Sequence, residues 1–208
     1  MNNVLLDELP TSWSGYEVNT WFQIGIQASL VYADEDLDES SKGSILLELL
    51  FSEEDGSMRE YPQDIDELTE LLDWFMNGWY HDNKPDRQDP RKRIMDYDID
   101  QWRIYADFLQ IYRIDLHQSD MHWWTFQGLL WNMPREQSSF MQVLEIRQKK
   151  PRPKATADEK KAISAGHKVY DLKPLKKQFT AKEKSEIDAY DEMMRKIRAQ
   201  QALEKLKE

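Results

Sequence analysis

The 208-residue chain has no cysteine and only seven glycines. The lack of cysteine excludes a disulfide scaffold and a Cys-ligated zinc site, and it fits a reducing cytoplasm. So few glycines leave little room for a phosphate cradle. The chain also contains no Walker loop, no Gly-x-Gly-x-x-Gly motif and no Gly-x-Ser-x-Gly motif. The sequence therefore offers no familiar nucleotide-binding or nucleophile motif.

Long apolar runs are missing as well. No window approaches the roughly 18 uninterrupted apolar residues of a membrane-spanning helix. Residues 1–8 show no basic region followed by an apolar run. We therefore expect neither a membrane span nor a signal peptide.

Charge is distributed unevenly along the chain. Residues 1–146 hold 10 basic and 29 acidic side chains, a net charge of −19, whereas residues 147–208 hold 18 and 10, a net charge of +8. The acidic part repels phosphates and anionic lipid, so we expect neither nucleic acid nor a membrane as its partner. The basic part has the charge to contact either, or to dock on an acidic protein surface, including a neighbouring copy of the chain.

Apolar spacing predicts a mainly α protein with a short N-terminal β-hairpin. The hairpin is predicted from residues 4–6 and 16–18, which flank Pro10 and Gly15. Asn19 or Thr20 is the predicted N-cap of the first helix. The predicted helices are 21–31, 45–51, 64–80, a helix capped by Asp98, 121–133 and 140–147. An acidic loop at 34–39 and a polar loop at 81–93 connect some of them.

The predicted domain organisation has three parts. Residues 1–147 form a compact acidic helical body, residues 148–156 a linker, and residues 157–208 an extended, charged, basic helical tail. The tail contains two polar helical segments, at 157–167 and 180–207. The second segment carries a thin apolar stripe, which we predict to bind a partner: Ile187, Tyr190, Met194 and Ile197.

Residues 98–134 are the most aromatic part of the chain, with four of its eight tryptophans. Each aromatic ring carries about 150–250 Å² of mostly apolar surface, so the stretch forms a core or a binding face. The predicted core consists of Trp74, Phe75, Trp102, Leu109, Trp124, Leu129 and Leu130. Adjacent helix positions point about 100° apart, so Trp123 is predicted to lie nearer the surface than Trp124. Trp123 and Trp131 are candidate anchors for a partner.

One cluster has the side-chain types of a metal site without its spacing. Asp115, His117, Asp120 and His122 are suitable ligands for a divalent ion. However, the two histidines are five residues apart, and a helical ligand pair is four apart. Both aspartates also lie where one helix ends and another begins, so capping accounts for them. We predict a structural role here and no metal.

A second cluster resembles a calcium loop only in part. Its four aspartates match positions 1, 3, 5 and 12 of such a loop: Asp96, Asp98, Asp100 and Asp107. Gln101 replaces the glycine that the loop needs for its turn. These aspartates suit the N-terminus of a helix, where the dipole favours negative charge. We therefore predict no metal, no cofactor and no catalytic residue in the chain.

Several short motifs follow one another in a specific order. They lie at residues 9–10, 15–22, 75–78, 97–100, 105–108, 112–116, 121–126 and 146–147. The most specific part is Ile-Asp-Leu at 114–116 followed by His-Trp-Trp-x-Phe at 122–126. Together they resemble, over roughly residues 5–172, the small family of tailed phages and prophages of Gram-positive bacteria that is named for gene product fifteen. The sequence departs from the family at residues 101–103, and its final helix lies outside the resemblance.

The resemblance implies a gene in the tail cluster, near the genes for the major tail protein and the tape measure. Neighbours there are often tail assembly chaperones, and the family brings no established reaction or catalytic residues. We therefore expect a tail morphogenesis factor that acts in the host bacterial cytoplasm. Our leading hypothesis is a tail assembly chaperone that binds the tape-measure protein, the tail tube protein or a neighbouring chaperone.

Two other functions remain open. One is a structural subunit of the virion or its tail, and the other is a metal-dependent enzyme that uses His117 and His122. A chaperone is absent from finished particles, whereas a structural subunit is present at a fixed copy number. The opposite charges of body and tail also favour a homo-oligomer in which copies associate head to tail.

Overall fold

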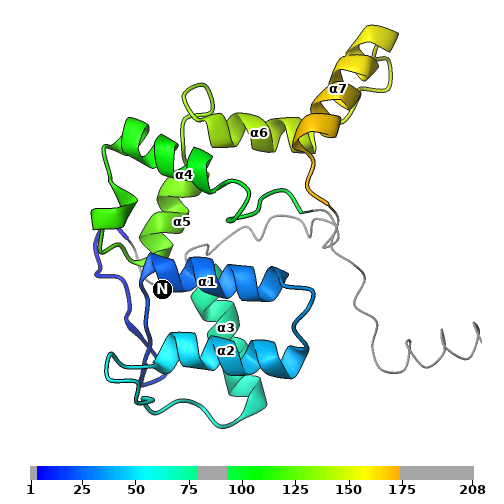
Figure 1. Ribbon diagram of the computed structural model, residues 1–208. Helices are drawn as coiled ribbons and strands as arrows, with labels where there is room; N and C mark the ends of the chain where they lie inside the picture. Colours follow the sequence, from blue (N-terminus) through cyan, green and yellow to red (C-terminus); the bar gives the residue numbers. More distant parts are fainter. Residues whose placement is uncertain (1–3, 79–92, 174–208) are drawn as a thin grey trace, which may run out of the picture. The chain divides into compact units, whose positions relative to one another are not determined.

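The protein is built from helices and one small β-hairpin. The computed structural model describes residues 4–78 and 93–173, which fall in a single compact unit of residues 1–175. Its elements are β1 (Ser12–Trp13), β2 (Tyr16–Glu17), α1 (Phe22–Ala33), α2 (Glu39–Phe51), α3 (Ile65–Asn77), α4 (Gln101–Asp107), the π-helix η1 (Phe108–Tyr112), the 3₁₀ turn η2 (Leu116–Gln118), α5 (Trp123–Trp131), α6 (Ser139–Gln148) and α7 (Ala157–Tyr170) (Figure 1). The predicted mainly α fold with a short N-terminal hairpin is confirmed. Within the described ranges, no helix has the length and apolar character needed to cross a membrane.

The N-terminal hairpin forms, but its first strand is not the predicted one. β1 pairs antiparallel with β2, with Ser12 opposite Glu17 and Trp13 opposite Tyr16. The two residues between the strands, Ser14 and Gly15, have φ angles of 51° and 93°. Positive φ at both positions is typical of a tight two-residue hairpin turn. Such a turn joins its immediate neighbours, and residues 4–6 therefore remain outside the sheet and exposed.

The two predicted caps of α1, Asn19 and Thr20, have other roles. Trp21 occupies the N-cap position and makes no side-chain cap hydrogen bond. The Asn19 amide instead donates to two carbonyl oxygens at the end of α2, 3.1 and 2.8 Å away. The Thr20 carbonyl accepts a 2.7 Å hydrogen bond from the backbone N–H of Trp123. Both residues therefore connect distant segments of the chain.

Aspartates set the start of α2 and of α3. The Asp38 side chain accepts a hydrogen bond from the backbone N–H of Ser41, and α2 begins well before the predicted residue 45. Polar residues fill the first turn of α2, so apolar spacing did not reveal it. Asp64 caps α3 in the same way, at the predicted start of that helix. The predicted end of the helix, at residue 80, lies outside the described residues.

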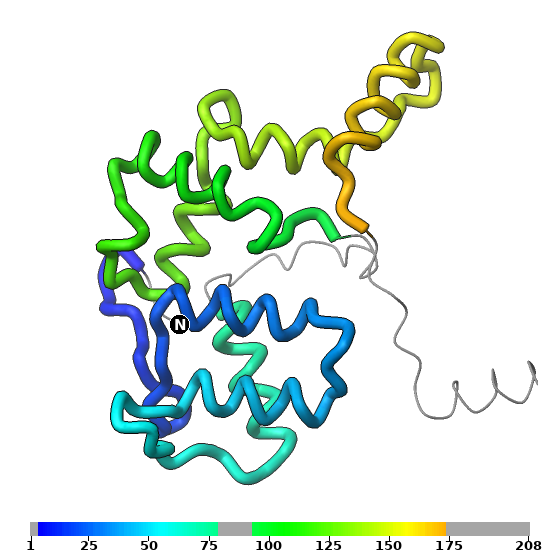
Figure 2. Tube along the Cα trace, viewed as in Figure 1, coloured from blue at the N-terminus to red at the C-terminus, as the bar shows by residue number. Residues whose placement is uncertain are grey.

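The helices pack around a buried core. α1 packs against α2 and against α5, and α4 packs against α6 (Figure 2). Of the predicted core residues, Phe75, Trp124 and Leu130 are buried. Trp74 and Leu129 are partly buried and pack against the same core.

Two residues that the spacing assigned to the core are exposed instead. Trp102 is 75% exposed and Leu109 is 43% exposed. The same helical stretch buries Ile104 and Phe108. Spacing shows which residues share a helix face, but it does not show which face the rest of the chain covers. The core prediction was wrong for Trp102 and Leu109.

The centre of the core is a group of stacked aromatic rings. The Phe126 ring lies 5.2 Å from the Phe22 ring, 5.0 Å from the Phe108 ring and 5.8 Å from the Trp123 ring, measured between centroids. These are favourable separations for aromatic pairs. The rings come from α1, η1 and α5, so this stack joins segments that are far apart in the sequence.

Glycines create the space for the paired tryptophans of α5. A Cβ atom at Gly25 would overlap the Trp123 indole, and one at Gly78 would overlap the Trp124 indole. Because each ring lies against a bare backbone, Trp123 is 0% exposed and Trp124 is 7% exposed. The expectation that Trp123 lies near the surface as a partner anchor is therefore wrong, because two glycines accommodate both rings in the core.

Replacing Gly25 with alanine is expected to destabilise the protein by about 1–3 kcal/mol, because the added methyl group overlaps a packed ring. Gly43 in α2 is the matched control, since a Cβ there meets no atom within 4 Å. Gly43→Ala is expected to stabilise by up to about 1 kcal/mol through helix propensity. Urea unfolding measures both effects. Equal changes in the free energy of unfolding for the two variants would contradict the close contact between Gly25 and the Trp123 ring.

The helical unit extends beyond the predicted boundary at residue 147. Residues 149–156 form no helix, and α7 then begins with a capping box between Thr156 and Glu159. α7 packs back on α6, and Arg147 Nε donates a 2.6 Å hydrogen bond to the carbonyl of Tyr170. The segment 157–170 therefore belongs to the same unit as the acidic body. The rest of the predicted tail, from residue 174, lies outside the described residues.

Candidate functional site

One face of α4 and η1 exposes apolar side chains to solvent. We call this face the α4 ridge, and it consists of Ile99, Trp102, Ala106 and Leu109. Ile99 lies in the turn just before α4, and the spacing of three or four residues places Trp102, Ala106 and Leu109 along one side of the helix. Trp102, with its large exposed ring, is the principal side chain of the ridge.

The stretch that carries the α4 ridge, residues 99–112, has little exposed charge of its own. Residues 99–112 contain three charged side chains, Asp100, Arg103 and Asp107. Asp100 and Asp107 are buried, and Arg103 is paired with Asp100 at 3.3 Å. Aromatic enrichment and charge depletion are typical of the centre of a protein–protein interface. The ridge therefore suits the apolar face of another protein segment.

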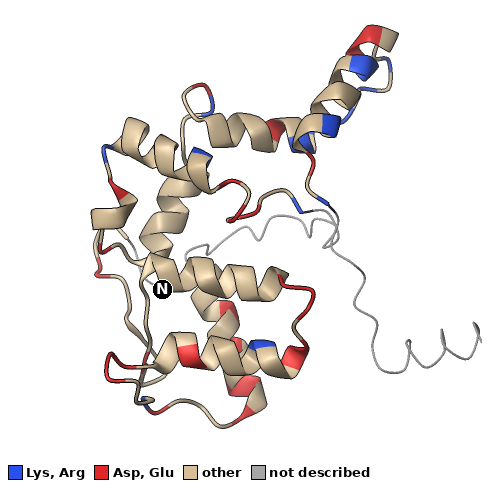
Figure 3. Ribbon diagram, in the orientation of Figure 1, with Lys and Arg blue, Asp and Glu red and all other residues tan. Residues whose placement is uncertain are grey.

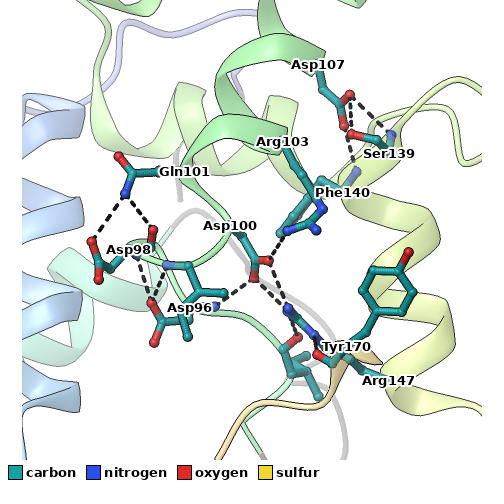
Figure 4. A network of polar contacts seen from close by, with 12 residues as sticks. Asp96, Asp98, Asp100, Gln101, Arg103, Asp107, Ser139, Phe140, Arg147 and Tyr170 are labelled. Atoms are coloured by element: carbon teal, nitrogen blue, oxygen red, sulfur yellow. Dashed lines mark hydrogen bonds and ion pairs between the residues drawn. The ribbon is translucent and has the colours of Figure 1, made fainter. Parts of the chain in front are cut away.

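A buried ion pair between Asp100 and Arg147 fixes the start of α4. Their side chains are 0% and 2% exposed. Arg147 Nη1 and Nη2 donate to the two carboxylate oxygens of Asp100 at 2.6 and 2.9 Å (Figure 4). A forked pair of this kind sets orientation as well as distance. It therefore holds α4 in one rotational position against α6.

The same arginine joins two further segments to this ion pair. Arg147 Nε donates to the carbonyl of Tyr170 at 2.6 Å, and Nη1 donates to the carbonyl of Ile94 at 3.0 Å. Arg103 lies over the Tyr170 ring, 5.8 Å from its centroid, and also donates to Asp100. The Arg147 guanidinium, which belongs to α6, thus contacts the residues before α4, the start of α4 and the end of α7.

Asp107 fixes the end of α4 to the start of α6. It accepts hydrogen bonds from Ser138 Oγ at 2.6 Å and from the backbone N–H of Phe140 at 2.9 Å. A carboxylate at a helix N-terminus satisfies free N–H groups and is favoured by the helix dipole. Asp100 and Asp107 therefore anchor the inner side of α4 at two points, and the ridge is left on the outer side.

The ridge continues into a π-helix, η1. This helix ends at Arg113, which has a φ angle of 60° in the left-handed region. Single π turns within helices are rare and frequently lie at functional sites. The hydroxyl of Tyr112 donates a 2.8 Å hydrogen bond to the carbonyl of Leu129, which ties η1 to α5. Leu109 thus belongs to a π-helical segment that a hydrogen bond ties to α5.

The aspartates and histidines near α5 have local structural partners. Asp115 accepts hydrogen bonds from the backbone N–H of His117 at 3.0 Å and from the Tyr105 hydroxyl at 3.2 Å. His122 Nδ1 accepts from the backbone N–H of Trp124 at 3.0 Å and caps α5. In residues 4–78 and 93–173, no cluster of three or more acidic or histidine side chains is arranged to hold a metal ion.

The aspartates of the calcium-like pattern are also engaged in local structure. Asp96 accepts hydrogen bonds from the backbone N–H groups of Asp98 and Ile99 at 2.8 and 3.0 Å, and it pairs with Arg93. Asp98, the predicted cap, lies in a turn before the helix, and Asp100 occupies the N-cap position of α4 instead. The cluster therefore shapes the approach to α4.

A second exposed feature is an open groove of about 420 Å³ beside α6. It is lined by Trp131, Arg135, Met141, Leu144, Glu145, Gln148 and Lys149. The predicted anchor Trp131 thus lines this groove, and its Nε1 donates a 2.8 Å hydrogen bond to Gln127 Oε1. The other predicted partner-binding residues lie outside the described residues: Ile187, Tyr190, Met194 and Ile197.

Comparison with known families decides the identity of the chain. Residues 5–172 match the family described as Bacteriophage Gp15 protein. The chain belongs to this family. The resemblance seen in the sequence is confirmed over the same residues, and the protein is related to bacteriophages. The chain matched none of the curated proteins and none of the solved structures with which it was compared.

Sequence reasoning missed both the α4 ridge and the ion pair of this Gp15-family protein. A signal for the ion pair was present in α6. Arg147 follows Phe140, Val143 and Leu144 at helical spacing, so a charged residue occupies a position on the buried face. Such a residue needs a buried partner. Nothing in the sequence, however, distinguishes Asp100 from the aspartates around it.

Replacing Arg147 with methionine is expected to destabilise the protein by about 3–5 kcal/mol, because the buried Asp100 loses its forked partner and keeps only the partly exposed Arg103. Arg103→Met is the matched control, because Arg103 also pairs with Asp100 but is partly exposed. Its loss is expected to cost at most about 1 kcal/mol. Denaturant unfolding measures both values, and similar costs for the two variants would refute the anchoring role of Arg147.

Acidification is expected to weaken the cap of α5. The ring nitrogens of His122 contact the Trp124 N–H and the Pro10 carbonyl, which suits a neutral ring protonated at Nε2. Burial lowers the pKa of His122. Its contribution to stability is therefore complete above the unfolded pKa of about 6.5 and is lost as the pH falls below that value.

Thermal unfolding between about pH 8 and about pH 5.5 tests this titration. Asparagine also caps helices but does not titrate in this range, so His122→Asn is expected to lose less stability on acidification than the wild type. The exposed His117 supplies the control, and His117→Asn is expected to keep the wild-type loss. An unchanged pH profile in His122→Asn would assign the acid sensitivity to other groups.

Proposed function

We propose that this Gp15-family protein is a tail assembly chaperone that binds helical segments of a tail protein, the tape-measure protein first, through the α4 ridge. The observation that carries this proposal is the exposure of Trp102 on an uncharged helix face. Charged residues make up 32% of the chain. An exposed, apolar and uncharged helix face on such a chain therefore requires an explanation, and the binding of a partner is the most direct one.

A tape-measure protein is a suitable client for such a surface. It is a long, helix-rich and aggregation-prone chain that needs soluble partners until tube subunits polymerise around it. A row of side chains with helical spacing packs readily against the apolar stripe of another helix. The acidic remainder of the body supplies net charge that keeps such a complex in solution.

The size of the α4 ridge favours transient binding. Four partly or largely exposed side chains offer on the order of 300–400 Å² of apolar surface. Stable complexes bury about 800 Å² on each partner. A ridge of this size therefore suits a contact that forms during assembly and is released when the tail tube is complete. We place this activity in the host bacterial cytoplasm.

The proposed role is binding and not catalysis. Among the described residues, Asp107 and His122 cap helices and Asp100 pairs with Arg147, so these acid and histidine side chains serve the fold. We propose that tail proteins are the partners and that neither nucleic acid nor a membrane is one.

Co-expression with the tape-measure protein of the same phage tests the proposal. The wild type is expected to co-purify with the tape-measure protein and to raise its soluble fraction. Trp102→Ala is expected to reduce both at least about tenfold, because aromatic anchors dominate interface energies. Its thermal midpoint is expected to stay within about 1 °C of the wild type, because an exposed side chain adds little to stability.

Trp21→Ala is the matched control, because Trp21 is also largely exposed but lies outside the ridge. This variant is expected to bind like the wild type. Purified virions are analysed in parallel by mass spectrometry. Presence of the protein in virions at a fixed copy number, or full binding by Trp102→Ala, would refute the chaperone proposal, and the first result would identify a structural subunit.

A further inference from the structure

The α2–α3 region carries a strongly acidic surface with one exposed apolar side chain. Residues 34–73 contain 15 acidic and two basic residues, and the ribbon is marked by acidic residues in the α1–α2 loop, α2 and α3 (Figure 3). Ile65, in the first turn of α3, is 72% exposed. Asp66, Glu67 and Glu70 lie around it on the exposed side of the helix. We call this surface the acidic knob.

The three acidic side chains of the knob are available for a partner. Within the described parts of the chain, Asp66, Glu67 and Glu70 form no ion pair with a basic side chain. Asp64 is already occupied, because it accepts the backbone N–H groups of Asp66 and Glu67. The acidic knob therefore presents negative charge around one apolar contact point.

The groove beside α6 has the complementary chemistry. Its apolar lining is Trp131, Met141 and Leu144, and its exposed basic residues are Arg135 and Lys149. Neither of these basic side chains forms an ion pair within residues 4–78 and 93–173. The groove also contains one acidic residue, Glu145, and one amide, Gln148. We call this site the basic groove.

The surroundings of the basic groove strengthen its positive charge. Residues 149–173 contain eight basic and three acidic residues, and the ribbon is marked by basic residues along the α6–α7 segment (Figure 3). Of the three acids, Glu159 is used in the capping box of α7, and Asp171 pairs with His167 at 2.7 Å. An incoming acidic surface thus meets a segment in which basic residues outnumber acidic ones.

From this complementarity we infer that the acidic knob of one copy docks in the basic groove of a second copy. Ile65 contacts the apolar lining, while Asp66 and Glu67 pair with Arg135 and Lys149. A second copy is the natural occupant because it supplies both surfaces. The interaction does not use the α4 ridge, so it is independent of tail-protein binding.

Such a contact is heterologous, because two different surfaces meet. Each copy in a pair keeps one free knob or one free groove. Heterologous contacts therefore continue into rings or open chains instead of stopping at a dimer. Because the contact depends on charges near the surface, salt at about 0.5 M is expected to weaken it through screening.

Analytical ultracentrifugation of the full chain at low salt tests this inference. The wild type is expected to form species larger than dimers as its concentration rises. Ile65→Asp removes the apolar contact of the knob, and Arg135→Glu with Lys149→Glu reverses the charge of the groove. Each variant alone is expected to associate at least about tenfold more weakly than the wild type.

An equimolar mixture of the two variants is the decisive sample. One variant keeps its groove and the other keeps its knob, so the mixture is expected to form dimers and nothing larger. A mixture that stays monomeric would overturn the inference. So would a wild type that remains monomeric, or either variant associating like the wild type.

Ile99→Asp is the matched control, because Ile99 is also an exposed isoleucine but belongs to the α4 ridge. This variant is expected to associate like the wild type. If Ile99→Asp abolished association, the contact between copies would run through the ridge and the inference would fail. Failure of the Trp102 experiment with tail protein would leave these results unaffected, so the two proposals are separable.

Discussion

The structure depends above all on one buried guanidinium. Four hydrogen bonds use the N–H groups of Arg147, two of them to Asp100 and two to backbone carbonyls. Removing a charge from water is costly, and only a complete set of partners offsets that cost. Those partners come from three segments of the chain, and α6, which carries Arg147, is the fourth segment at this point. The guanidinium is therefore satisfied only when all four segments are in place, which links the folding of α4, α6 and α7.

The outward face of α4 follows from this inward attachment. Polar contacts at Asp100 and Asp107 hold the helix by its inner side, and Phe108 adds a buried ring to the central stack. Trp102 and Leu109 lie away from these attachments and are exposed. The uncharged ridge is thus the surface that the fold leaves after its buried contacts are made, whereas charge gathers on α2–α3 and on α6–α7.

The sequence predicted what depends on neighbouring residues. The amphipathic helix that starts at residue 64 and the buried helix that contains Trp124 were both predicted from short-range patterns. Distant contacts were not predictable. Asp100 and Arg147 are 47 residues apart, and the place for the Trp123 ring is a glycine in another helix. The same limit explains Trp102, because helical spacing shows that residues share a face without showing what covers it.

The positions of the tryptophans also give the protein built-in fluorescent reporters. Trp123 is fully buried, and its indole nitrogen finds no hydrogen-bond partner among the described residues, so its emission belongs to an apolar environment. Trp102 faces water, where emission shifts to longer wavelength and soluble quenchers reach the ring. The short-wavelength part of one spectrum therefore reports the integrity of the core. The long-wavelength, quenchable part includes Trp102 together with the exposed Trp21, so its Trp102 share responds to whatever covers the α4 ridge.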